Sequence, residues 1–157
     1  MTAEPIFAYV DTSVFGGVYD SEFEEHSRSF FDQAHEGRFT IVTSPLVLDE
    51  LQSAPLRVQE LYRQFEKSVR VQEVSDPVAD LLNSYMDAHI VGERWRADAF
   101  HVALATIAGC QVIVSWNFRH IVHMQKILLY NEVNRVNGYP ALGIYTPSEV
   151  IEYEEEQ

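Results

Sequence analysis

The longest apolar stretch of the chain lies within residues 98–118, DAFHVALATIAGCQVIVSWNF. Residues 99–108 are apolar at nearly every position, as expected of a helix that other elements enclose on all sides. Gly109 follows, where the end of a helix favours a left-handed residue. The β-branched run 112–114 is typical of a central parallel strand, and the polar segment 115–117 stands at its carboxyl end, where open α/β sheets bind ligands.

Apolar periodicity and turn residues predict the remaining elements. We expect strands at 6–10 and 39–43, a half-exposed strand at 69–74 and a last strand at 142–145. We expect helices at 21–35, after Ser44-Pro45, after Pro55, from Ser75 to near Gly92, at 120–136 and after Thr146-Pro147, with a turn at Gly16-Gly17.

This order of elements favours an α/β fold. It predicts a single domain over residues 1–157, with three layers and a mainly parallel, five-stranded central sheet covered by helices on both faces. The acidic residues within 152–157 are expected to form a frayed end. The strands that end at Asp11 and Asn117 are the most apolar, so we place them side by side in the middle, with their carboxyl ends in one crevice.

Composition favours a globular domain and argues against a membrane or secreted protein. The 157 residues are 46% hydrophobic and 22% charged, which is ordinary for a globular domain with a buried core. No run is long enough to cross a bilayer and no signal-peptide pattern begins the sequence, so we expect a cytoplasmic protein without membrane contact. Cys110 is the only cysteine, which fits a reducing compartment. The formal net charge of −13 argues against nonspecific nucleic-acid affinity, but not against a nucleic-acid enzyme whose acids surround metal ions.

Three acids and one amide follow strand ends or begin helices on the same predicted side of the sheet. Asp11 follows the first strand, Glu50 lies in the helix after the second, and Asp98 opens the buried helix. Asn117 follows the fourth strand. Carboxylate and amide oxygens without a cysteine or histidine cluster suit Mg²⁺ or Mn²⁺, and acids gathered in one crevice repel one another unless a cation neutralises them.

The same residues have purely structural interpretations. Asp11 could cap the turn that follows it, Asp98 could be a helix N-cap, and Asn117 is a common turn residue. Asp49 competes with Glu50, and either could be a solvated helix residue.

The histidines do not add to this pattern. His101 lies one helical turn after Asp98, where a lone histidine on an apolar helix is expected to be a satisfied core residue. His120 and His123 share a predicted helix face without an acidic or cysteine partner nearby, so no zinc site is expected.

Four segments of the chain carry a family resemblance. They are YVDTSVF around Asp11, SPLVLDEL around Glu50, RADAFHVALA around Asp98 and VSWNFRHI around Asn117. In order and spacing the chain resembles the PIN-domain ribonucleases, whose bacterial members are mostly VapC-type toxins. The resemblance implies that the three acids bind metal. The family's usual fourth residue is Asp, so Asn117 keeps an oxygen ligand but removes one negative charge.

The resemblance implies an endoribonuclease that hydrolyses RNA phosphodiester bonds with Mg²⁺ or Mn²⁺ and leaves 5′-phosphate and 3′-hydroxyl ends. The ion would polarise the phosphoryl oxygens and lower the pKa of a bound water. Thr12 and Ser13 would orient Asp11 or hold that water. A type II toxin paired with an antitoxin, and a homodimer, are implied as well.

Basic and aromatic residues flank Asp98 and Asn117 in the sequence. They suit phosphate contacts or stacking on an unpaired base, although surface ion pairs and partial core positions explain them equally well. The residues are Arg94, Trp95, Arg96, Trp116 and Arg119.

Two other functions compete with the ribonuclease. Asn117 leaves open a catalytically weakened or inactive PIN-like module that binds RNA or a protein. An aspartyl-phosphate phosphatase would also place an Asp after the first strand, but that chemistry uses a second Asp where this chain has Ser13.

Overall fold

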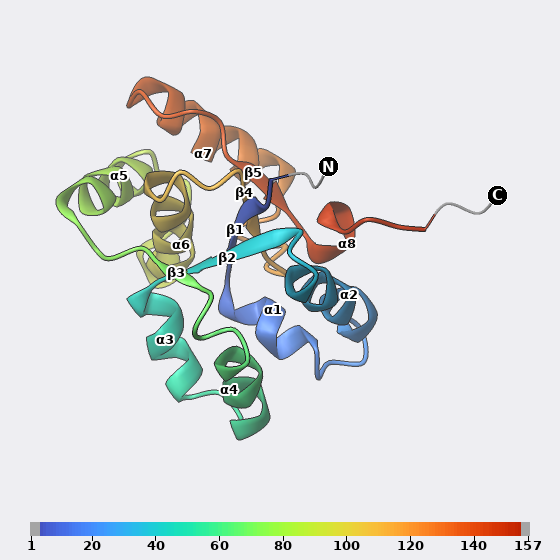
Figure 1. The fold of residues 1–157 in the computed structure, drawn as a ribbon. Coiled ribbons are helices and arrows are strands. Elements are labelled where there is room, and N and C mark those ends of the chain that lie inside the picture. Colours follow the sequence, from blue (N-terminus) through green and yellow to red (C-terminus); the bar gives the residue numbers. More distant parts are fainter. Residues whose placement is uncertain (1–3, 155–157) are drawn as a thin grey trace.

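The computed structural model describes residues 4–154, which form three layers around a central sheet (Figure 1). The strand order is β3-β2-β1-β4-β5, and every neighbouring pair is parallel. The predicted α/β fold with a parallel five-stranded sheet is therefore confirmed. The strands are β1 (Ile6–Val10), β2 (Phe39–Thr43), β3 (Arg70–Val71), β4 (Val112–Val114) and β5 (Gly143–Tyr145).

Two groups of helices cover the sheet. Helix α1 contacts α2, α3 and α4, whereas α5 packs against α6 and α7, and α8 packs on α2 (Figure 1). The helices are α1 (Thr12–Gly17), α2 (Glu24–His35), α3 (Pro45–Gln52), α4 (Leu56–Arg63), α5 (Asp76–Asp87), η1 (Glu93–Trp95), α6 (Arg96–Ile107), α7 (Met124–Val136) and α8 (Pro147–Val150).

The two most apolar strands lie side by side, as predicted. β1 is the middle strand, with Tyr9 opposite Ile113 of β4 and opposite Val42 of β2. The backbone N–H of Asp11 also donates to the carbonyl of Val114 at 3.2 Å. The residues that follow β1 and β4 therefore start from adjacent positions at one edge of the sheet.

Helix α6 is enclosed as its sequence predicts. Seven of its residues are buried, and Gly109 after its end has a φ of +74°, in the left-handed region. The helix begins at Arg96, however, with Trp95 as its N-cap. Asp98 is therefore not the N-cap but a residue of the first turn.

The chain after β1 differs from the prediction. Gly16 and Gly17 belong to α1 and not to a turn, because the Asp11 side chain caps a helix that begins at once. The helix predicted over 21–35 begins later than expected. The backbone N–H groups of Phe23 and Glu24 bond to the Asp20 carbonyl, so the chain turns there and α2 begins at Glu24.

Three other elements are shorter than the sequence predicts. The half-exposed strand covers only two residues of 69–74, and α5 ends at Asp87, before Gly92. Helix α7 begins at Met124, with His123 as its N-cap. His120 lies in the preceding turn, so these two histidines do not share a helix face. In the described part of the chain, no helix is long and apolar enough to span a membrane.

Candidate functional site

Asp11 is a buried carboxylate at the carboxyl end of β1. Its Oδ1 accepts hydrogen bonds from the backbone N–H of Ser13 at 3.1 Å and from the Ser13 hydroxyl. Its Oδ2 accepts one from the Ser115 hydroxyl at 2.7 Å. The first of these bonds is an N-cap of α1, so the structural interpretation of Asp11 is correct, and the residue also presents a charge at the end of the central strand.

The charge on Asp11 is costly. Burial raises the pKa of Asp11, and repulsion from Glu50 acts in the same direction. His101 and the hydroxyls of Ser13 and Ser115 oppose this rise without reversing it. A buried carboxylate in this state is stabilised by any cation that comes next to it.

Glu50 lies on α3, beside α1 and α6. Its Oε1 accepts hydrogen bonds from Thr12 Oγ1 at 3.0 Å and from His101 Nε2 at 2.6 Å. Burial acts to raise the pKa of Glu50, but its bond to His101, the charge of that histidine and the Thr12 bond leave the pKa lowered. Asp49 is exposed, so Glu50 is the acid of this pair that faces the other candidate residues.

His101 is buried in α6, as expected, but its ring is part of a hydrogen-bonded chain. Besides the contact with Glu50, its Nδ1 lies 2.8 Å from the Tyr9 hydroxyl. Tyr9 in turn contacts Ser44 Oγ at 2.8 Å. Residues of β1, α6 and the start of α3 thus form one network that ends on the Glu50 carboxylate.

Asp98 is held by a second histidine that sequence analysis did not select. Its Oδ2 lies 3.0 Å from His120 Nδ1. The His120 ring stacks on Trp95 with centroids 4.6 Å apart. Glu50 in α3 and Asp98 in α6 therefore each have one carboxylate oxygen paired with an imidazole nitrogen.

Asn117 has a structural role in the loop between β4 and α7. Its Oδ1 accepts hydrogen bonds from the backbone N–H groups of Arg119 at 3.2 Å and His120 at 2.9 Å. This arrangement is an Asx turn, as the structural interpretation expects. The side-chain oxygen holds the loop and faces the backbone.

This loop connects the two parts of the candidate site. Ser115 at its start bonds to Asp11, and His120 further along bonds to Asp98. Ser115 Oγ also accepts the N–H of Asn117 at 2.9 Å. The loop conformation therefore fixes both carboxylates at once.

The oxygen ligands suit a hard cation that keeps part of its water shell. Within residues 4–154, no three acidic, histidine or cysteine side chains converge closely enough to enclose a metal ion. Mg²⁺ in proteins is often held by one or two carboxylates, with water and substrate phosphates as the other ligands. The buried charge of Asp11 and its neighbour Glu50 fit a site of that kind.

Comparison with known families decides the class of fold. The profile of the PIN domain matches residues 8–121, which is most of the chain. The chain belongs to the PIN domain family. No curated protein sequence matches it.

Several solved structures share this fold at low sequence identity. VapBC2 from Rickettsia felis, solved bound to a promoter DNA fragment, gives a TM-score of 0.58 at 13% identity, covering 90% of this chain and 98% of that one. FitAcB from Neisseria gonorrhoeae gives a TM-score of 0.56 at 16% identity, covering 91% of this chain and 99% of that one. Mycobacterium tuberculosis VapC20, a sarcin-ricin loop cleaving toxin, gives a TM-score of 0.51 at 16% identity, covering 72% of this chain and 92% of that one. At these identities the likeness shows the fold alone.

The three candidate arginines of this PIN domain, Arg94, Arg96 and Arg119, occupy two kinds of environment. The guanidinium groups of Arg94 and Arg119 lie over the Trp95 ring, at 5.0 and 5.3 Å from its centre. Both residues are exposed. Arg96 contacts Glu93 at 3.3 Å and Asn83 at 3.2 Å, which is the surface pairing that the structural interpretation describes. Arg94 and Arg119 therefore remain the better candidates for phosphate contacts.

Trp116 of the PIN domain is packed. Its indole N–H donates to Ser27 at 2.8 Å, and its ring stacks on Phe23 with centroids 4.4 Å apart. Phe118 borders the same cluster and is 50% exposed. Trp116 is thus an anchor for the loop, and Phe118 presents the more accessible aromatic ring.

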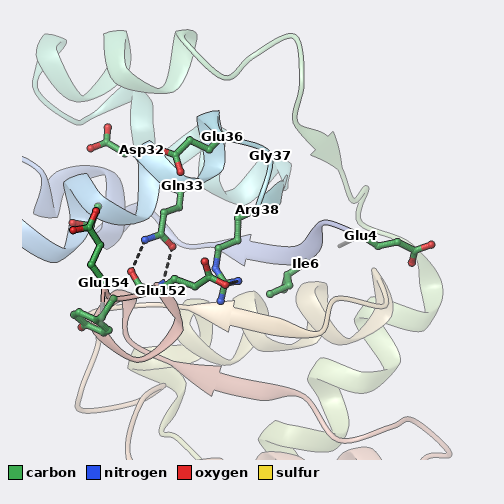
Figure 2. Close-up of a pocket in the computed structure, with 11 residues that line it drawn as sticks. Glu4, Ile6, Asp32, Gln33, Glu36, Gly37, Arg38, Glu152 and Glu154 are labelled. Atoms are coloured by element: carbon green, nitrogen blue, oxygen red, sulfur yellow. Dashed lines mark hydrogen bonds and ion pairs between the residues drawn. The ribbon is translucent and has the colours of Figure 1, made fainter. Parts of the chain in front are cut away.

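A pocket of about 730 Å³ lies at the opposite end of the sheet, where β1 and β2 begin (Figure 2). Arg38 there pairs with Glu152 at 2.9 Å, and the Gln33 amide exchanges two hydrogen bonds with the Glu152 backbone. The first residue of the acidic segment is therefore tied to α2. The frayed end is predicted for residues 152–157, and residues 155–157 of that segment lie outside the described residues.

Proposed function

We propose that this PIN domain is a divalent-cation-dependent endoribonuclease, and the cytoplasmic toxin of a type II toxin–antitoxin pair. The observation that supports it best is the buried Asp11 carboxylate beside Glu50 at the carboxyl end of the sheet. Within the described residues, no side chain bonds to Glu50 Oε2 or to Asp98 Oδ1. These oxygens remain available to a ligand.

Asp11, Glu50 and Asp98 would hold Mg²⁺ or Mn²⁺. The ion would supply charge neutralisation at the phosphoryl oxygens and lower the pKa of a water molecule. The chain's own residues orient the acids: Ser13 and Ser115 act on Asp11, Thr12 on Glu50. Exposed Arg94 and Arg119 would bind phosphates.

The partners follow from the same proposal. The likeness in fold to VapBC2 and to FitAcB supports an antitoxin as partner. We propose RNA as the substrate and a homodimer as the assembly.

Cleavage of a labelled single-stranded RNA tests the nuclease. We expect Mg²⁺- or Mn²⁺-dependent cleavage by wild type, and a loss of about 100-fold or more in Asp11→Asn and Glu50→Gln, as loss of a group central to catalysis produces. Asp49→Asn is the matched control, because it removes an exposed acid next to Glu50. Cleavage that persists in EDTA, or in Asp11→Asn, would refute the proposal.

One observation favours a second candidate, a PIN-like module that binds RNA or protein without turnover. The Asn117 oxygen is engaged by two backbone N–H groups and brings no charge. Robust metal-dependent turnover by wild type rules this candidate out. Absence of turnover in wild type, together with cleavage by Asn117→Asp, would establish it.

A further inference from the structure

His101 uses both ring nitrogens in a chain of buried groups. The residue is 3% exposed, and its Nδ1 and Nε2 lie 2.8 Å from the Tyr9 hydroxyl and 2.6 Å from Glu50 Oε1. Tyr9 is fully buried, and so is Ser44, which caps α3. The chain Ser44–Tyr9–His101–Glu50 therefore runs from the start of α3 through the central strand and α6, and returns to α3.

The donor in the bond to Glu50 follows from the chemistry of the carboxylate. Ionised Glu50 only accepts hydrogen bonds, so His101 Nε2 must carry the proton that it donates. A ring with one proton then accepts from the Tyr9 hydroxyl at Nδ1, and a ring with two protons donates from Nδ1 to the Tyr9 oxygen. Tyr9 can serve in either way, because burial raises the pKa of its hydroxyl and keeps it protonated. In both cases the Ser44 hydroxyl pairs with Tyr9 at 2.8 Å.

The donors to Glu50 act on a single oxygen. Both His101 Nε2 and Thr12 Oγ1 bond to Oε1. These two hydrogen bonds hold the carboxylate through Oε1 and leave Oε2 without a hydrogen bond among the described residues. Glu50 is half-buried, and a half-buried glutamate without such bonds would sample several rotamers.

We infer that His101 is a positioning residue for Glu50: it donates from Nε2 to Oε1 and holds the carboxylate so that Oε2 can bind a divalent cation. The inference rests on the proposed function for the role of Oε2. The network itself does not depend on that function. Ser44 and Tyr9 fix the orientation of the ring, as a second group commonly does for histidines near metal sites.

Nitrogen NMR of the metal-free protein tests the network directly. The expected result at neutral pH is a His101 ring with a protonated Nε2, and Tyr9→Phe should alter the Nδ1 signal. A ring protonated only on Nδ1 would overturn the inference. This measurement needs no metal ion, so the network is tested even if the nuclease proposal fails.

Titration of Mn²⁺ into purified protein tests the positioning role. We expect His101→Phe to weaken Mn²⁺ affinity about 10- to 100-fold, and Tyr9→Phe to weaken it less, because the His101–Glu50 bond remains. His101→Gln should recover part of the loss, because its amide can donate to Glu50.

Thr106→Val is the matched control for the Mn²⁺ titration. It removes a buried hydroxyl from the same helix, where Thr106 bonds to Val102 and Asn134, and it should leave Mn²⁺ affinity unchanged. Wild-type affinity in folded His101→Phe would overturn the positioning role. If wild type binds no Mn²⁺, the proposed function and the positioning role fail together, whereas the tautomer still decides the network.

Discussion

Asp11 performs two tasks that favour different chemistry. As a helix cap it needs only an oxygen that accepts the Ser13 N–H, and an amide would serve equally well. As a cation ligand it needs a charge, which is costly in a buried position. The chain has a carboxyl group at this position although burial raises its pKa.

Asp11→Asn should therefore stabilise the metal-free protein. The amide keeps an oxygen for Ser13 and can donate to Ser115, while the buried charge is lost. We expect a gain on the order of 1 kcal/mol in the free energy of unfolding, or a few degrees in Tm. Urea and thermal unfolding in EDTA measure it, with Asp49→Asn as control. A less stable Asp11→Asn would contradict the cost assigned to this charge.

The stability difference between the two proteins should also depend on pH. A carboxyl whose pKa is raised by folding contributes stability at low pH and loses it as the pH rises through the folded value. The advantage of Asp11→Asn should thus be smallest near pH 4 and grow towards pH 7. Unfolding of metal-free protein in a pH series tests this, and an advantage that shrinks with rising pH would refute it.

The proximity of Asp11 and Glu50 could be predicted from sequence, but not the histidines that contact the candidate acids. Asp11 and Glu50 follow strand ends, and parallel topology brings strand ends together. His101 lies 51 residues from Glu50 and 92 from Tyr9, so no local spacing relates these residues. The sequence predicts His120 within a helix that, in the structure, begins only at Met124.

Helix α1 depends on a close contact at its last residue. A Cβ atom at Gly17 would lie 2.6 Å from Ser27 Oγ and 2.8 Å from the Trp116 indole nitrogen. These two atoms bond to each other at 2.8 Å. Glycine at this position thus lets α1, α2 and the loop that carries Ser115 meet.

Gly17→Ala and Gly16→Ala form a matched pair. The first forces apart a packed indole and a buried hydroxyl, which should cost about 1–3 kcal/mol of stability. The second meets nothing within 4 Å and gains helix propensity, so it should be neutral or stabilise by up to roughly 1 kcal/mol. Urea denaturation of both variants tests the difference. Equal stabilities would show that the contact yields without cost.

Sequence patterns located the elements better than their ends. The apolar runs of β1 and β4 predicted the central strands, because a strand covered on both faces must be continuously apolar. Helix α1 was missed because Gly16-Gly17 is more common in turns, whereas capping by Asp11 and contacts with three helices stabilise a helix there. Such tertiary contacts leave no local pattern.

The molecule as a whole carries a large negative charge. Eleven Lys and Arg residues stand against 24 Asp and Glu residues. Some of the cations are already paired with nearby acids, as Arg38 with Glu152 and Arg28 with Glu24. Self-repulsion over the surface must therefore lower the stability of the fold.

Added salt should stabilise this protein. Raising NaCl from about 20 to about 300 mM screens the repulsion and should increase stability by roughly 1 kcal/mol, measured as a rise in Tm. KCl should act like NaCl, because screening depends on ionic strength. A fall in Tm with salt would show that attractive pairs outweigh the repulsion.

The position of β1 in the sheet has a consequence for synthesis of the chain. The ribosome makes β1 first, yet this strand ends up between β2 and β4. The bond from Ser115 to Asp11 spans 104 residues, and His120 must be made before it can pair with Asp98. A growing polypeptide therefore cannot assemble both halves of the site until residue 120 has been translated. Under the proposed function, cleavage activity arises only after that point of synthesis.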